Sequence, residues 1–116
     1  MDLSSIGIGT DIVKISRFKS RPYELHKDFY KKLFTESEID YCLRFKEPYK
    51  HFAGKFAIKE AVKKSISEKI SLADIKTGHI HSKPTVSIIS NKYRFLVSVS
   101  HEQDNAIAVV ISERII

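Results

Sequence analysis

The chain has 116 residues, of which 42% are hydrophobic and 29% are charged. This length corresponds to a single domain, residues 1–116, and the composition excludes collagen-like, low-complexity and disordered proteins. The one cysteine, Cys42, cannot form an internal disulfide, and the sequence shows neither a signal peptide nor an apolar run of membrane-spanning length. We therefore expect a cytoplasmic protein without a membrane partner.

The charge balance is basic, with 20 Lys and Arg residues against 14 Asp and Glu residues and a formal net charge of +6. Such an excess favours acidic partners, namely nucleic acid, a phosphorylated small molecule or an acidic protein. Composition alone does not choose among these partners, and many proteins of this charge bind nothing acidic.

The first predicted element is a strand over residues 5–15, in which residue character alternates. One face carries the isoleucines, and the other carries Gly7, Gly9 and Asp11. Glycine has no side chain, so the space beside the carboxylate of Asp11 suits a ligand. The alternative is an exposed acid at a strand end that pairs with a lysine.

Residues 15–34 predict two short helical segments, interrupted at Pro22, that expose much of their basic surface. The next helix begins after Thr35, because Thr35 and Glu38 have the spacing of a capping box. We expect this helix to run through Leu43.

The longest regular element is a helix over residues 48–66, with apolar side chains around most of its circumference. It is predicted to be central and largely buried. Glu60 and Lys64 interrupt its apolar surface one turn apart. They either form a helical ion pair or hold a ligand, since an ion pair on a buried face costs more in desolvation than it returns.

Four strand-like stretches are expected after this helix, at residues 76–81, 85–90, 93–100 and 105–112, with turns at Lys83-Pro84, Asn91 and Asp104-Asn105. His101 lies at the mouth of the last predicted hairpin. The order of strand, helices and strands indicates an α+β fold with a largely antiparallel sheet.

Asp11 and Glu60 are candidates for a metal site. Together with a phosphate they would supply the few hard oxygen ligands that Mg²⁺ takes, while water completes its octahedron. Nearby lysines would neutralise the phosphate charge that the metal leaves uncovered.

Three separated segments carry a resemblance to a known family: GIGTDIVKISR (7–17), FAGKFAIKEAVKK (52–64) and SVSHEQDNAIAVVI (98–111), with Lys83-Pro84 as a weaker fourth point. With these motifs the chain resembles the holo-acyl-carrier-protein synthases, the small bacterial 4'-phosphopantetheinyl transferases. The resemblance covers nearly the whole chain. It implies the 4'-phosphopantetheinyl transferase-like fold, with a largely antiparallel sheet wrapped on a long central helix.

The resemblance also implies an activity, the Mg²⁺-dependent transfer of 4'-phosphopantetheine from coenzyme A to a serine of apo-acyl carrier protein. Adenosine 3',5'-bisphosphate would be released, and the reaction would serve fatty acid biosynthesis. Members of this family form homotrimers with sites between neighbouring subunits. We expect the same assembly here.

Site residues follow from the matching positions. Asp11 and Glu60 look like the Mg²⁺ ligands and, with Lys64, like the catalytic set. The residues expected to bind coenzyme A are Lys55, Lys59, Lys64 and His101, with Lys55 standing where an arginine is common. The residues expected to face the carrier protein are Arg17, which matches a basic family position, and Lys19 and Arg21, which would extend a basic rim.

The chain departs from the family after the long helix. A glycine-rich turn that approaches phosphate is common there, whereas residues 65–69 read SISEK. Ser67 or Lys69 would have to replace its backbone contacts.

Two other functions stay open. Aromatics interleaved with basic residues over 17–34 are typical of a nucleic-acid-binding module, although that function leaves Asp11 and Glu60 unexplained. A non-catalytic interaction domain that has kept the fold is the second alternative.

Overall fold

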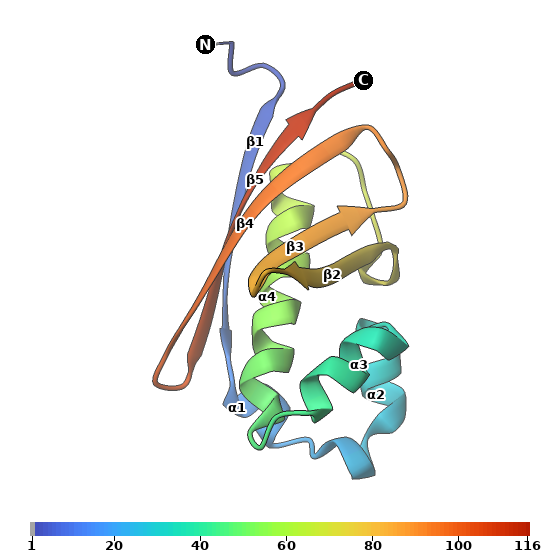
Figure 1. Cartoon of the computed structure of the whole chain (residues 1–116), viewed down its shortest axis with the longest axis vertical. Coiled ribbons are helices and arrows are strands. Elements are labelled where there is room, and N and C mark those ends of the chain that lie inside the picture. Colours follow the sequence, from blue (N-terminus) through green and yellow to red (C-terminus); the bar gives the residue numbers. More distant parts are fainter. Residues whose placement is uncertain (1) are drawn as a thin grey trace.

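A computed structural model describes residues 2–116 and places the long helix α4 (Pro48–Ser65) at the centre (Figure 1). A three-stranded sheet crosses one side of α4, while a hairpin and the short helices lie on its other sides. The remaining elements are β1 (Ile6–Lys14), α1 (Ser16–Lys19), η1 (Tyr23–Leu25), α2 (Lys27–Leu33), α3 (Glu36–Leu43), η2 (Leu72–Asp74), β2 (Ile75–Ile80), β3 (Lys83–Ile88), β4 (Tyr93–Glu102) and β5 (Asn105–Arg114).

The strands are antiparallel but form two sheets, one ordered β1-β5-β4 and one made of β2 and β3. The predicted α+β class is confirmed. The turn between β2 and β3 is formed by His81 and Ser82, whose φ angles are 51° and 66°. Two successive positive φ angles suit a tight hairpin. Lys83-Pro84 therefore begins β3, and the prediction that it forms the turn is wrong.

Close contact with α4 fixes the position of β1. A Cβ atom on Gly9 would lie 1.9 Å from the Ala61 carbonyl oxygen, and one on Gly7 would lie 1.8 Å from that of Ser65. Only glycine lets the strand backbone approach the helix this closely. The space predicted beside Asp11 is thus filled by α4 rather than left open for a ligand. The same approach brings Asp11 to the edge of the helix.

The predicted starts of α3 and α4 and the predicted burial of α4 are confirmed. Pro48 occupies the first turn of α4, most of whose side chains are buried. The Thr35 hydroxyl accepts from the Glu38 amide at 3.3 Å, and Glu38 accepts from the Thr35 amide at 2.7 Å, which completes the capping box. No helix within residues 2–116 is long and apolar enough to cross a membrane.

The basic segment before α3 is anchored more firmly than the sequence predicts. Phe18 and Tyr30 are fully buried and pack against each other with ring centroids 6.0 Å apart. The Tyr30 hydroxyl also contacts the carbonyl oxygens of Phe18 at 3.0 Å and Arg21 at 2.7 Å. This aromatic cluster fixes α1 against α4, so the basic side chains of α1 extend from a helix whose position is fixed.

Candidate functional site

An ion pair joins β1 to α4 at the edge of their contact. The Lys64 ammonium lies 3.0 Å from Asp11 Oδ1 and donates to the Thr10 carbonyl oxygen at 3.0 Å. The Lys64 side chain is 55% exposed and that of Asp11 is 16% exposed. The alternative ion pair between Glu60 and Lys64 is absent from residues 2–116, and the expectation that Lys64 lies on a buried face is wrong.

Glu60 lies on the same face of α4 as Lys64, one turn earlier, and is half-buried. In the described chain its carboxylate has no ion pair and no hydrogen bond. Residues 2–116 contain no group of three or more acidic, histidine or cysteine side chains that could hold a metal alone. Carboxylate oxygens are the protein ligands that Mg²⁺ takes, with water completing its shell, so Asp11 and Glu60 are the residues that would hold it.

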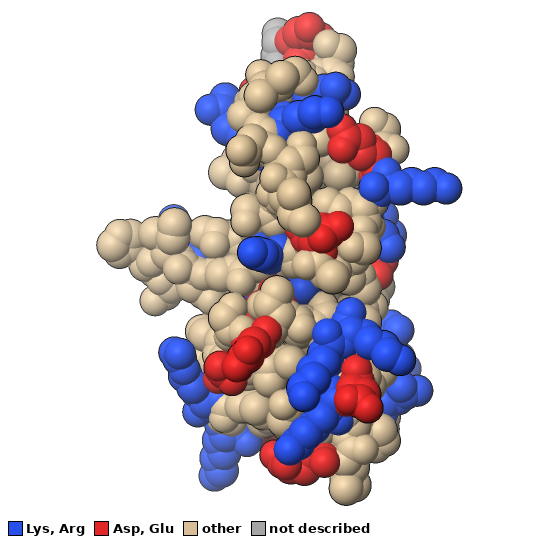
Figure 2. Space-filling view, turned by 90° about the vertical axis from the view of Figure 1, so that its right-hand side faces the viewer, with Lys and Arg blue, Asp and Glu red and all other residues tan. Residues whose placement is uncertain are grey.

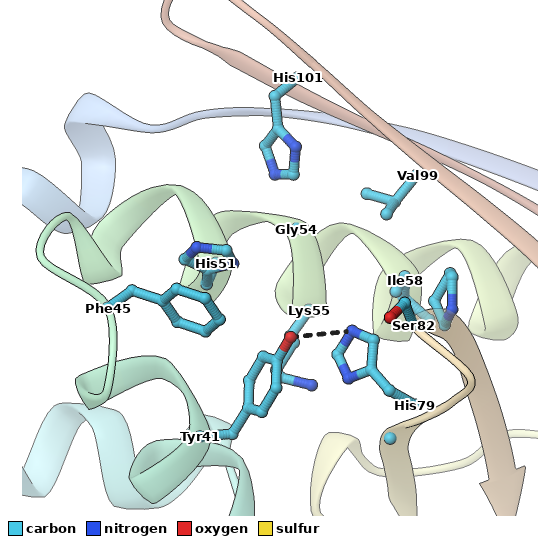
Figure 3. A pocket seen from close by; sticks show the side chains of 12 residues that line it. Tyr41, Phe45, His51, Gly54, Lys55, Ile58, His79, Ser82, Val99 and His101 are labelled. Atoms are coloured by element: carbon cyan, nitrogen blue, oxygen red, sulfur yellow. Dashed lines mark hydrogen bonds between the residues drawn. The ribbon is translucent and has the colours of Figure 1, made fainter.

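A groove of about 590 Å³ lies between α3, α4, the β2–β3 hairpin and β4 (Figure 3). Lys55 projects into it from α4 and His101 from β4, while the aromatic rings form its walls. Ring pairs stack here, Phe45 on His51 at 3.7 Å between centroids and Tyr41 on His79 at 4.5 Å. The lining residues are Tyr41, Phe45, His51, Gly54, Lys55, Ile58, Gly78, His79, Ser82, Pro84, Val99 and His101.

Lys55 brings a nearly buried positive charge to this groove. The residue is 5% exposed, and its ammonium donates to the Thr77 hydroxyl oxygen at 3.1 Å and lies 4.6 Å from the centre of the Tyr41 ring. No carboxylate of residues 2–116 lies within ion-pair distance. Burial lowers the pKa of Lys55, while Cys42 and Glu38 oppose that shift. With one protein hydrogen bond made, the ammonium keeps donors for an anion.

His101 reaches the groove because of a glycine. A Cβ atom on Gly54 would lie 3.1 Å from His101 Nε2, tighter than ordinary contact. His101 Nε2 lies 3.0 Å from the Lys50 carbonyl oxygen. A carbonyl oxygen only accepts, so Nε2 carries the proton and Nδ1 is left for another partner.

Comparison with known proteins agrees with this geometry. The family model of the 4'-phosphopantetheinyl transferase superfamily matches residues 7–110. The chain belongs to this superfamily. The predicted transferase class and the resemblance to holo-acyl-carrier-protein synthases are thereby confirmed.

Relatives of similar length share most of the chain. The holo-[acyl-carrier-protein] synthase of Thermodesulfovibrio yellowstonii is 34% identical over 108 residues, covering 90% of this chain and 96% of that protein. The Clostridium novyi synthase is 39% identical over 121 residues, covering 93% and 87%.

Two solved synthase structures share the fold. The Bacillus anthracis synthase, in complex with CoA (3',5'-ADP), has a TM-score of 0.79 and 28% identity, and the alignment covers 93% of this chain and 96% of that one. The Helicobacter pylori synthase, in complex with coenzyme A, has a TM-score of 0.78 and 31% identity, with coverage of 91% and 99%.

Lys59 does not lie where a nucleotide could reach it in this family member. Its side chain is 0% exposed, and its ammonium pairs with Glu38 Oε1 at 2.7 Å. The same ammonium donates to the carbonyl oxygens of Leu33 at 2.9 Å and Leu72 at 3.4 Å. All three donors are used inside the protein, so the prediction that Lys59 binds coenzyme A conflicts with the geometry.

The basic residues predicted to face a carrier protein lie on or beside α1. The Arg17 guanidinium lies 4.8 Å from the centre of the Phe56 ring, and that of Arg21 lies 4.5 Å from the Phe29 ring. Lys19 lines a second groove, of about 360 Å³. Figure 2 shows Lys and Arg side chains gathered over the lower part of the molecule, where α1, α2 and α3 lie in Figure 1.

Ser65 ends α4, and residues 65–69 contain no positive φ angle. The backbone geometry that a glycine-rich turn would provide is therefore absent from this segment. Side chains line a groove of about 580 Å³ here instead, including Ser67, Lys69 and Lys63.

The sequence analysis does not predict the aromatic wall of the groove between α3, α4, the β2–β3 hairpin and β4, called the large groove below. Tyr41, Phe45, His51 and His79 come from three parts of the chain, and no motif links them. Burial, together with the nearby charges of Lys50, His101, Lys55 and His79, lowers the pKa of His51 to about 4. His51 is thus neutral at physiological pH and contributes an aromatic face rather than a charge.

Proposed function

We propose that this chain is a holo-acyl-carrier-protein synthase that transfers 4'-phosphopantetheine from coenzyme A to a serine of apo-acyl carrier protein. The reaction requires Mg²⁺, releases adenosine 3',5'-bisphosphate and serves fatty acid biosynthesis in the cytoplasm. The observation that carries the proposal is the edge between β1 and α4, where Lys64 pairs with Asp11 and Glu60 lies one turn earlier on the same face of α4.

Different side chains would bind the metal ion and the phosphates of coenzyme A. Asp11 and Glu60 would hold Mg²⁺, which when bound neutralises charge on the pyrophosphate. The Lys64 ammonium is held beside Asp11 and is exposed to solvent, so a phosphate can reach it. Lys55 and His101 would bind further phosphate oxygens of coenzyme A in the groove. Ser67 and Lys69 extend this set beyond the end of α4.

The proposed transfer exchanges one phosphorus–oxygen bond for another and needs no oxidant or reductant. The serine oxygen of the carrier forms a bond to the phosphorus that bears pantetheine, and the bond from that phosphorus to the bridging oxygen breaks. Adenosine 3',5'-bisphosphate leaves with that oxygen, and the proton of the serine hydroxyl is released to solvent. Catalysis then depends on alignment and on neutralising charge at the leaving group, which are the tasks suited to fixed carboxylates and lysines.

Self-association is part of the proposal, as a homotrimer with sites between subunits. Its support is the outer face of the β1-β5-β4 sheet, where apolar side chains stand on all three strands and pair across them. These side chains are exposed to between 36% and 71%: Ile8, Ile12, Leu96, Ile107, Val109 and Ile111. A contiguous apolar face of this kind indicates an interface.

Assembly is tested by sedimentation. Leu96→Glu is expected to shift a trimer to monomers, whereas Leu25→Glu, at a leucine that is 78% exposed outside the sheet, leaves the trimer intact. A monomeric wild type would contradict this part of the proposal.

Activity is tested by incubating the protein with coenzyme A, Mg²⁺ and an apo-acyl carrier protein and weighing the carrier by mass spectrometry. Asp11→Asn and Glu60→Gln are each expected to lower turnover at least about a hundredfold, ~2.7 kcal/mol, with little change in melting temperature. Asp40→Asn, at an exposed acid on α3, is the matched control.

Chelation of Mg²⁺ should stop the transfer, and its return should restore it. An unmodified carrier under all conditions would refute the transferase. Salt-sensitive binding of DNA or RNA would then favour the nucleic-acid-binding module, while its absence would favour the non-catalytic domain.

A further inference from the structure

A chain of hydrogen bonds links the buried ion pair of α3 and α4 to the wall of the large groove. Glu38 Oε2 accepts from the Thr77 amide at 2.8 Å and from the Thr77 hydroxyl. The Thr77 oxygen in turn accepts from the Lys55 ammonium at 3.1 Å. Glu38 itself is fixed by Lys59 at 2.7 Å and by the Thr35 amide at 2.7 Å.

The donors and acceptors available fix the direction of each hydrogen bond from Lys55 through Thr77 to Glu38. Burial would raise the pKa of Glu38, but hydrogen bonds from Lys59, Thr77 and the Thr35 amide outweigh it and hold that pKa below its ordinary value. An ionised carboxylate only accepts, so the Thr77 hydroxyl proton points to Glu38. The lone pairs of Thr77 are therefore turned to Lys55, which has only donors.

Thr77 does not reach the groove, whereas Lys55 lines it. Lysine has four rotatable side-chain bonds and many rotamers, and Thr77 is its only hydrogen-bond partner within the described residues. The ammonium would otherwise be free to turn away from the groove.

We propose that Thr77, itself held by Glu38, is a positioning residue that fixes the Lys55 ammonium at the groove wall to receive an anionic group of the substrate. The inference rests on the proposed function, because that function supplies the phosphates. Thr77 acts through Lys55 and has no substrate contact of its own.

The first test removes the hydroxyl and keeps the shape. Thr77→Val should raise the Kd for coenzyme A, measured by calorimetry, about three- to tenfold, the range of one hydrogen bond. Thr77→Ser keeps the hydroxyl and should bind within about twofold of the wild type. Thr85→Val, on the paired strand β3, removes a hydroxyl that bonds to neither Glu38 nor Lys55 and is the matched control.

A double-mutant cycle separates positioning from a general loss of structure. In a Lys55→Met background, Thr77→Val should have no further effect on the Kd for coenzyme A, because the group that it positions is gone. Additive effects of the two substitutions would overturn the inference.

A second measurement needs no coenzyme A. NMR titration of the Lys55 side chain in the ligand-free protein should show a lower pKa in Thr77→Val than in the wild type, because the ammonium loses its acceptor. The other charged or titratable groups around Lys55 are unchanged in this variant: Glu38, Tyr41, Cys42, His51, Lys59 and His79. An identical Lys55 titration in both proteins would overturn the inference.

The two measurements also separate this inference from the proposed function. If the wild type binds no coenzyme A, the proposed function fails, while the Lys55 titration still tests whether Thr77 holds the ammonium. Thr77→Val should fold, since the Thr77 amide still serves Glu38 and valine favours strands. Should it not fold, Thr77→Cys offers a weaker donor and acceptor and should give intermediate values in both measurements.

Discussion

Two lysines of α4 each form an ion pair with an acidic residue of another element, but the two pairs differ in how exposed they are to solvent. Lys59 and Glu38 are 0% and 1% exposed, with an Nζ to Oε1 distance of 2.7 Å. Lys64 and Asp11 are 55% and 16% exposed, with a distance of 3.0 Å. The two lysines are separated by little more than one turn of the same helix.

Their surroundings determine what each pair can do. Every donor of Lys59 has an acceptor inside the protein, so the pair fixes α3 to α4 and has nothing left for a ligand. An exposed pair adds little stability, generally under ~1 kcal/mol, because water screens it. Lys64 can therefore move from Asp11 to a phosphate at small cost, which is what a binding site needs.

Breaking the buried pair should give the largest effect on stability. Glu38→Leu leaves the Lys59 charge unpaired in the core and should reduce the free energy of unfolding by about 3–5 kcal/mol in urea denaturation. The double variant Glu38→Leu, Lys59→Met removes both charges and should recover much of that loss. A single variant as stable as the wild type would show that this pair does not fix α3.

Acid pH should weaken the same pair. Hydrogen bonds hold the pKa of Glu38 below its ordinary value of 4.5, so its contribution to stability is complete above that pH and is lost as pH falls through the folded-state pKa. Melting temperatures should therefore fall more steeply below pH 4.5 in the wild type than in the double variant, which lacks the titrating group. Equal slopes would contradict this assignment.

The exposed pair should show the opposite pattern. Lys64→Ala should change the free energy of unfolding by less than ~1 kcal/mol, yet weaken coenzyme A binding severalfold, because it removes a charge-assisted contact. Lys92→Ala, at an exposed lysine in the turn before β4, is the control for loss of charge alone. A large loss of stability with unchanged affinity would make Lys64 a structural residue.

The contrast between the pairs also shows what could be predicted from the sequence. The capping box at Thr35, the buried character of α4 and the alternation along β1 are local patterns, and the structure confirms them. Asp11 and Lys64 each interrupt an apolar pattern in the sequence, which indicates a site, and the structure joins them in an ion pair.

Other features depend on distant contacts that no local pattern encodes. Lys59 is 21 positions from Glu38, and Lys55 is 22 positions from Thr77. Gly7 and Gly9 suggested open space because a sequence does not show that the α4 backbone fills it. Spacing identified the charged residues of the site, but only tertiary packing separates Lys59 from Lys64.

The smallest expected effect concerns a third use of positive charge, at the surface. Arg17 extends from α1 over the Phe56 ring, with Lys19 and Arg21 nearby, and this basic rim should steer an acidic carrier protein. Arg17→Glu should raise the KM for the carrier severalfold and leave that for coenzyme A nearly unchanged. The effect should shrink as salt rises, because exposed charges more than ~8–10 Å apart are screened near physiological ionic strength. Lys92→Glu, at an exposed lysine in the turn before β4, is the control for net charge. Equal effects on both substrates, or an Arg17→Glu variant no different from Lys92→Glu, would mean that the carrier docks elsewhere.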